Sequence, residues 1–171
     1  MKNMDVLQDE NIQEIIELVK TVKGPRKLKT ALEDYHDADI SYALEGLTKE
    51  ERLHLYQVLG AERVADIFSY LEEPDEYLSE INIQQAAKVI SEMDVDDAVD
   101  LLEEIDDEYE AKLLDMLGRK ESHDIRLIQS YDEDEIGAKM TTNFIVIHRG
   151  LTVKQAMKEL IRQSEDNDNI D

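Results

Sequence analysis

The chain has 171 residues, with 42 Asp and Glu against 19 Lys and Arg, which gives a net charge of −23 at pH 7. This balance argues against nucleic acid or an anionic membrane surface as a partner, because phosphate groups would be repelled. The sequence contains no Cys, which excludes disulfide scaffolds and zinc–thiolate sites, and it contains no apolar run approaching the ~20 residues of a membrane span. We therefore expect this piece of sequence to be soluble and intracellular, without direct membrane insertion.

The first predicted helix covers residues 11–22, where apolar side chains recur at helical spacing. Gly24 and Pro25 should end it, because Gly favours helix ends and Pro lacks the N–H that a continuing helix needs. A basic patch of Lys and Arg follows at residues 20–29. Two interpretations of this patch remain open: a solvated loop and helix face, or an internal partner for an acidic stretch farther along.

A repeat of short helices begins near residue 28. Apolar clusters follow one another at intervals of 12, 12, 22, 12 and 12 residues, and end at Leu47, Leu59, Leu71, Met93, Ile105 and Leu117. Candidate N-caps occur in the same rhythm at Thr48, Asn82, Asp94 and Asp106. A helix this short is marginal alone in water, so each must bury its apolar stripe on its neighbours. We predict an all-α superhelix of short stacked helices, with a joint between two three-helix groups near Pro74.

The most acidic stretch spans residues 92–110, which hold eleven Asp and Glu and no Lys or Arg. Asp94 is a candidate N-cap, and Asp97 lies where a capping box places an acid. Asp96 and Asp100 are four residues apart, so their carboxylates share one helix face. Such a pair suits Mg²⁺, which usually takes one or two carboxylates and keeps several waters. The alternative is that these acids only complement the helix dipole and solvate the helix.

The pattern changes after residue 130. Residues 131–142 form a turn-rich connector, and residues 144–147 are a compact β-branched run typical of a strand. Thr152 then begins a capping box, and residues 153–161 form an amphipathic helix. One strand alone has no sheet to join. We therefore expect the sequence to stop inside a second domain, with a disordered acidic tail at residues 164–171.

These residues resemble a known family. Tyr131, Gly137 and the run Met140-Thr141-Thr142, followed by the strand and helix, resemble the junction between the acidic helical N domain and the first CBS domain of MgtE-type magnesium transporters. The 12-residue helix rhythm is similar to that N domain. Ile136 departs from the pattern, since the family usually has a small residue before the Gly.

The resemblance implies a division of the chain. Residues 1–130 would be the acidic helical-repeat N domain, 131–142 the connector, and 143–171 the truncated start of a CBS domain, a small strand–helix fragment. The partners would be the CBS domains and membrane pore of the same longer protein. That protein would be a homodimer at the cell membrane, with this part on the cytoplasmic face.

The resemblance also implies a function and site residues. In the family, carboxylates at the interface between the N domain and the CBS domains sense cytosolic Mg²⁺, and bound ions favour the closed pore. The pattern Asp96-Asp97-x-x-Asp100 matches a family motif and points to Asp96 and Asp100 as ligands. An acid in a second helix matches Asp66, in the run Ala65-Asp66-Ile67-Phe68.

An enzyme is not expected. The four His show no paired metal spacing, and the six Gly form no phosphate-binding loop. An EF-hand beginning at Asp94 fails because its sixth position is Val99 and its twelfth is Ile105. The alternative function is an acidic all-helical scaffold that docks a basic protein and has no metal role, resembling the helical repeats of flagellar motor-switch proteins. The strand and helix after Thr142 favour the transporter interpretation, because a scaffold does not need them.

Overall fold

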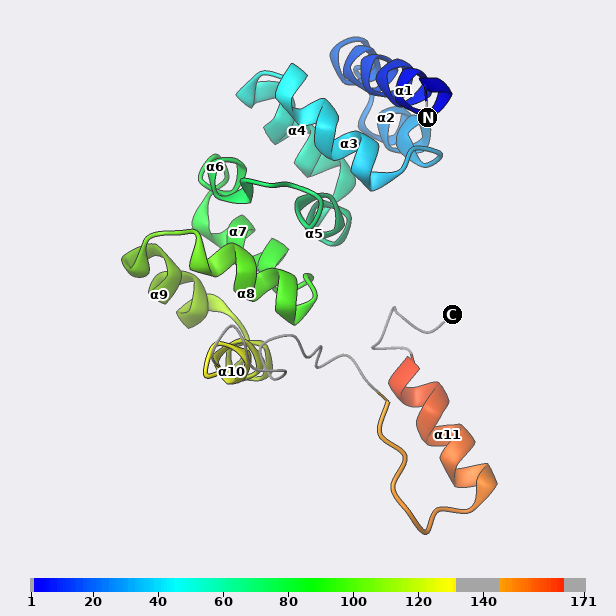
Figure 1. Ribbon diagram of the computed structural model, residues 1–171, viewed down its shortest axis with the longest axis vertical. Helices are drawn as coiled ribbons and strands as arrows, with labels where there is room; N and C mark the ends of the chain where they lie inside the picture. The colour runs from blue at the N-terminus through cyan, green and yellow to red at the C-terminus, as the bar shows by residue number, and fades with distance from the viewer. Residues whose placement is uncertain (1, 132–144, 165–171) are drawn as a thin grey trace.

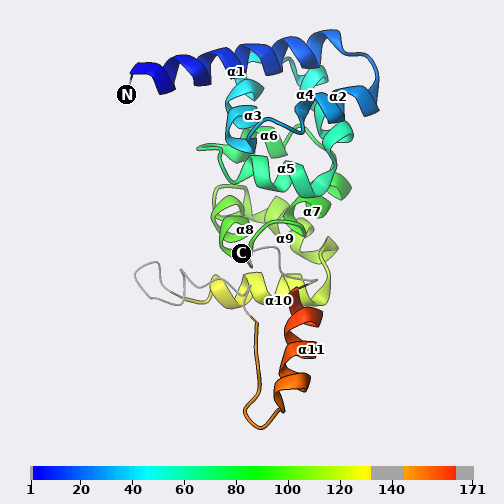
Figure 2. The same cartoon turned by 90° about the vertical axis from the view of Figure 1, so that its right-hand side faces the viewer.

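The computed structural model of the protein describes residues 2–131 and 145–164, and these residues form helices without any assigned strand. The elements are α1 (Lys2–Thr21), α2 (Pro25–Leu32), α3 (Asp37–Ala43), the 3₁₀ turn η1 (Leu44–Gly46), α4 (Lys49–Leu59), α5 (Ala61–Phe68), α6 (Pro74–Leu78), α7 (Ile83–Ile90), α8 (Val95–Glu103), α9 (Asp107–Met116), α10 (Arg119–Ile128) and α11 (Val153–Ser164). Helices α1 to α10 form one elongated stack, with α1 at one end and α10 at the other (Figures 1 and 2). The predicted all-α superhelix is confirmed.

The helices end close to the predicted apolar positions. Helix α4 ends at Leu59, and α9 ends one residue before Leu117. Helix α5 ends earlier than predicted, at Phe68, because the next residues form a turn in which the Leu71 N–H donates to the Phe68 carbonyl over 3.1 Å. The last apolar residue of a cluster can therefore lie in the turn and still pack on the core.

All four predicted N-cap residues stand at helix N-caps, and three of them make side-chain cap hydrogen bonds. Thr48 and Glu51 make a reciprocal capping box, and the side chain of Asn82 accepts the N–H of Gln85. The Asp106 carboxylate accepts N–H groups of the first turn of α9. The predicted box at Asp94 is wrong, because Asp94 stands at the N-cap of α8 without a side-chain cap hydrogen bond. The residue three positions later is Asp97, whose side chain is shorter than the Glu of a usual capping box. Its carboxylate also repels that of Asp94.

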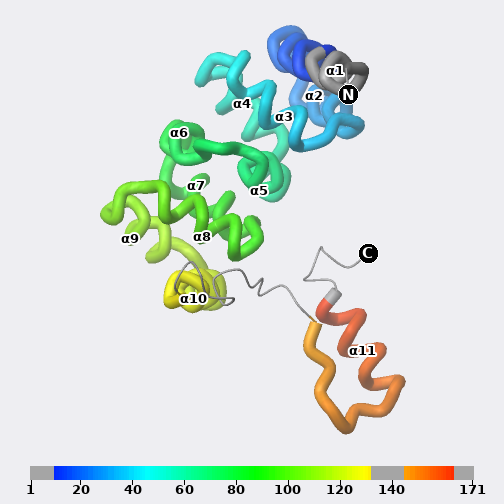
Figure 3. Tube along the Cα trace, in the orientation of Figure 1, coloured from blue at the N-terminus to red at the C-terminus, as the bar shows by residue number. Residues whose placement is uncertain are grey.

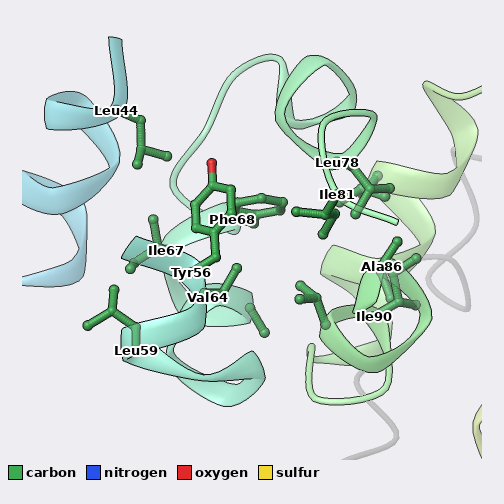
Figure 4. Close-up of a cluster of buried hydrophobic side chains, with 14 of the residues drawn as sticks. Leu44, Tyr56, Leu59, Val64, Ile67, Phe68, Leu78, Ile81, Ala86 and Ile90 are labelled. Carbon is green, nitrogen blue, oxygen red and sulfur yellow. The ribbon is translucent and has the colours of Figure 1, made fainter. Parts of the chain in front are cut away.

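The core runs along the stack in steps. Helix α3 packs on α1 and α5, α7 packs on α5 and α9, and α8 packs on α10. Figure 4 shows the middle of this core, where Phe68 reaches from α5 toward Leu78 and Ile81. The Phe68 ring meets Tyr56 edge-on, with 5.6 Å between the ring centroids. The two groups of helices on either side of α6 therefore share one apolar core.

The basic patch of residues 20–29 lies on α1 and α2, at one end of the stack. Its Lys and Arg side chains are exposed, and the Lys20 ammonium group donates to the Gly46 carbonyl over 3.1 Å. Helix α8 lies several helices away along the stack (Figure 1). The hypothesis that this patch is the internal partner of the acidic stretch is therefore wrong, and the patch is a solvated helix face.

The tail forms the predicted helix α11 but no strand. Thr152 and Gln155 make the expected capping contacts before α11. Residues 145–147 are not assigned as a strand; Phe144 and residues 132–142 of the connector lie outside the described residues. The Val146 backbone instead pairs with the Gln163 side chain, which accepts its N–H over 2.8 Å and donates to its carbonyl over 3.0 Å. A single extended segment has no neighbouring strand, so a side-chain amide satisfies its backbone. The trace in Figure 3 shows this tail apart from the stack.

Candidate metal-binding surface

Helix α8 presents its acids to the outside of the stack. Its apolar side buries Ala98, Val99, Leu101 and Leu102 in the core. Since this side faces inward, Asp96 and Asp100 are left on the outer side, where Asp96 is half-buried and Asp100 is exposed. The structure therefore confirms that both predicted residues lie on one helix, toward solvent.

The centre of this surface is Asp97, which the sequence analysis placed only in a capping box. Burial, and then the neighbouring charges of Asp96, Asp94 and Asp100, together raise the pKa of Asp97 from 3.8 to about 6. A raised pKa means that the ionised carboxylate is disfavoured in the folded protein. Ionising Asp97 therefore adds a partly buried charge beside three other acids.

The acidic surface continues past the end of α8. The pKa of Glu104 is raised, first by burial and then by the charges of Asp75, Asp100 and Glu73. The charge of Asp100 thus contributes to the raised pKa of two carboxyl groups, Asp97 before it and Glu104 after it. The spacing from Asp94 to Glu104 could have suggested that the acids of α8 form one row. No sequence signal places Glu73 and Asp75 beside α8, because that proximity is tertiary.

Asp66 lies elsewhere in the stack, on the exposed side of α5. Within the described residues, no group of three or more His, Asp or Glu is arranged to hold a metal ion. The structure therefore does not unite Asp66, Asp96 and Asp100 into one coordination group. Asp96 and Asp100 are brought together only in the sense that both act on Asp97.

The acids of α8 fit part of a Mg²⁺ site. Mg²⁺ is a hard cation that binds carboxylate oxygens and keeps several waters, so one or two half-exposed carboxylates are a suitable donor set. A divalent cation here would also relieve the repulsion that, after burial, contributes to the raised pKa of Asp97. The described residues do not enclose an ion, and further ligands would come from water or from another domain.

Comparisons with known proteins give a consistent result. The family model of the MgtE intracellular N domain matches residues 35–134. The magnesium transporter MgtE of Thermus thermophilus is 28% identical over 150 residues, which cover 85% of this chain and 33% of the relative. The magnesium transporter MgtE of Enterococcus faecalis is 36% identical over 157 residues, which cover 86% of this chain and 34% of the relative. The chain thus spans about a third of the length of these relatives.

Solved structures agree with this similarity. The soluble part of a magnesium transporter matches with a TM-score of 0.82 at 30% identity, over 95% of this chain and 65% of that one. The cytosolic domain of the Mg²⁺ channel MgtE in complex with ATP matches with a TM-score of 0.75 at 28% identity, over 86% of this chain and 61% of that one. Among the described helices of this chain, none is both long and apolar enough to cross a membrane.

Proposed function

The chain belongs to the MgtE intracellular N-domain family, and we propose that it acts as the regulatory Mg²⁺-sensing domain of a magnesium transporter. The observation that carries this proposal is that Asp96 and Asp100 lie together on the outward side of α8, opposite the buried apolar side of the helix. Burial, and then the charges of Asp96, Asp94 and Asp100, raise the pKa of the neighbouring Asp97 to about 6, so a further negative charge is costly there. A divalent cation would lower this cost by neutralising part of the negative charge.

The proposed mechanism uses ligands from two sides. Asp96 and Asp100 supply carboxylate oxygens from α8, and Asp66 supplies one from α5. CBS domains of the same longer protein, beginning within residues 143–171, supply the remaining ligands, together with water. Without Mg²⁺ the acidic surfaces repel each other; with Mg²⁺ the ions screen this charge, draw the domains together and favour the closed pore.

The proposal places this domain, residues 1–130, at the cytoplasmic face of the membrane in a homodimer, joined by residues 131–142 to the CBS domains and through them to the pore. It assigns no chemical reaction to the chain. The carboxyl groups act by charge and coordination, and no proton or group transfer is required of them.

The proposal is tested by thermal unfolding of this chain with and without Mg²⁺. The variant Asp96→Asn/Asp100→Asn should be more stable than the wild type without Mg²⁺ and should gain less when Mg²⁺ is added. At ten times its dissociation constant, which we expect in the millimolar range, Mg²⁺ should stabilise the wild type by about 1.4 kcal/mol through preferential binding to the folded state.

Two controls separate coordination from screening. Monovalent salt at matched ionic strength measures general screening. The variant Glu103→Gln/Asp107→Asn removes the same number of charges from exposed positions nearby. If this control and the Asp96/Asp100 variant respond equally to Mg²⁺, and no more than to monovalent salt, the metal role is refuted and the scaffold interpretation is favoured.

A further inference from the structure

The joint around α6 separates the three proposed ligands. Asp66 lies on α5, before the joint, whereas Asp96 and Asp100 lie on α8, after it. Figures 1 and 2 show α5 and α8 at successive levels of the stack. The angle between the two halves of the stack therefore decides how far Asp66 lies from the acids of α8.

One charged side chain bridges this joint. Arg52 projects from α4, and its Nε donates to Glu80 Oε2 over 2.8 Å while its Nη2 donates to Glu80 Oε1. Glu80 belongs to the turn between α6 and α7. The two side chains are only 15% and 16% exposed. A planar guanidinium that binds both oxygens of a carboxylate fixes their relative orientation as well as their distance.

Arg52 is itself held in place from three directions. Its Nη1 donates to the carbonyl of Leu44 over 3.1 Å and to that of Leu47, at the end of η1. Its guanidinium carbon lies 5.3 Å from the centroid of the Tyr77 ring, on α6. These contacts leave the guanidinium little freedom to follow Glu80 if the joint opens.

The rest of the joint is apolar. Phe68 and the side chains around it hold the two halves together, but apolar contact is not directional and tolerates small rotations. The hydrogen bond from Arg52 also lowers the pKa of Glu80, which keeps this carboxylate ionised and the bidentate pair intact at neutral pH. The directional part of the joint is therefore the pair of Arg52 and Glu80.

We propose that Arg52 and Glu80 are positioning residues that set the angle between the two halves of the stack, and with it the distance of Asp66 from Asp96 and Asp100. The effect of the pair on the angle depends only on the joint. Its effect on the distance between the acids rests on the proposed function, since these acids are the proposed ligands of Mg²⁺.

The angle can be followed through the distance between two spin labels. Because the sequence contains no Cys, labels attach only to the Cys residues that are introduced. Spin labels at Gln57→Cys on α4 and Lys88→Cys on α7 use exposed positions on the two sides of the joint. Glu80→Gln should broaden the distribution of distances between the labels, because the charged pair is lost. Arg52→Lys keeps the charge but not the planar fork, and should broaden it as well. If both variants leave the distribution unchanged, the proposal is overturned.

Tyr56→Phe provides a matched control in the same joint. The Tyr56 hydroxyl is buried there without a hydrogen-bond partner among the described residues, so its removal breaks no directional contact. This variant should leave the distribution of label distances unchanged. Broadening equal to that of Glu80→Gln would mean that any change of packing loosens the joint, which would also overturn the proposal.

The link to the metal is tested by Mg²⁺ titration followed by nuclear magnetic resonance of the backbone amides. Glu80→Gln should weaken apparent binding about threefold, a size typical of coupling between interacting sites. In an Asp66→Asn background it should cause no further loss. An equal loss with and without Asp66 would refute the positioning role. If Asp96→Asn/Asp100→Asn leaves Mg²⁺ binding unchanged, the proposed function fails, whereas the spin-label result still decides whether the pair sets the angle.

Discussion

The two halves of the stack use similar short helices but treat charge in opposite ways. In the first half, Arg63 of α5 donates to Asp37 over 2.8 Å and to the carbonyls of Leu32 and Tyr35 over 2.8 and 2.9 Å. In the second half, burial and then the charges of Asp96, Asp94 and Asp100 raise the pKa of Asp97. The ion pair described there, Lys112 with Glu108, is exposed and lies within one turn of α9.

The two halves differ in how far charged side chains contribute to packing. In the first half, an Arg satisfies the carbonyls at a helix end and an acid together, so charge contributes to holding helices in place. In the second half, apolar burial is supplemented by polar contacts of acids, such as the hydrogen bond that Gln129 donates to Glu110 over 2.8 Å. Asp96 and Asp100 lie on the outer side of α8, where an outside cation could reach them.

The largest effect is expected where the halves meet. Phe68→Ala removes a side chain that is 1% exposed and packs on Tyr56, and should lower the free energy of unfolding by about 4 kcal/mol, typical of a buried aromatic. Chemical denaturation followed by circular dichroism measures this loss. If the halves share one core, as the structure indicates, the variant unfolds in a single transition. Two separate transitions would show that the halves unfold independently, as two domains.

An intermediate effect is expected at the Arg of the first half. Arg63→Ala leaves Asp37 and two carbonyls without their donor and should cost about 2 kcal/mol. Lys112→Ala in the second half should leave stability nearly unchanged, because exposed pairs within a helix contribute little. Thermal unfolding of both variants at the same pH measures the contrast. Equal losses would contradict the difference between the halves.

A smaller effect than that of Arg63→Ala, and of opposite sign, is expected at Asp97. A carboxyl group whose pKa is raised from 3.8 to about 6 on folding stabilises the folded state only while it is protonated. Its contribution is complete below pH 3.8 and is lost as the pH rises through about 6. Asp97→Asn cannot ionise, so at pH 7 it should be more stable than the wild type by about 1 kcal/mol, since Asp97 is only partly buried and water reduces the cost of its charge.

Unfolding midpoints measured between pH 3.5 and 7.5 check this sign. The gain of Asp97→Asn over the wild type should shrink as the pH falls and should vanish below about pH 4. A gain in stability that does not depend on pH would mean that the Asn packs better than the Asp. Ionisation of Asp97 would then not be the cause of the difference in stability. The second half would then differ from the first in composition only.

Much of the fold was predictable because its determinants are local. The apolar clusters and the caps at Thr48, Asn82 and Asp106 depend on residues within one or two turns, which a single sequence displays in full. The N-cap position of Asp94 is confirmed, but the capping box with Asp97 is wrong, because two carboxylates repel each other. The strand at residues 145–147 was misjudged because a strand requires a partner that local sequence does not supply.

The sequence alone therefore determined the helical class, the 12-residue rhythm, the joint near Pro74, and Asp96 and Asp100 as outward-facing acids, since periodicity decides which side of a helix is apolar. Only the tertiary structure decided that Arg52 meets Glu80 across that joint, that Asp75 lies near Glu104, and that burial beside other acids raises the pKa of Asp97. Contacts between residues 28 or more positions apart, and the burial that shifts a pKa, depend on how the helices stack. That stacking is set by the sum of many weak apolar contacts, none of which is visible in a single segment.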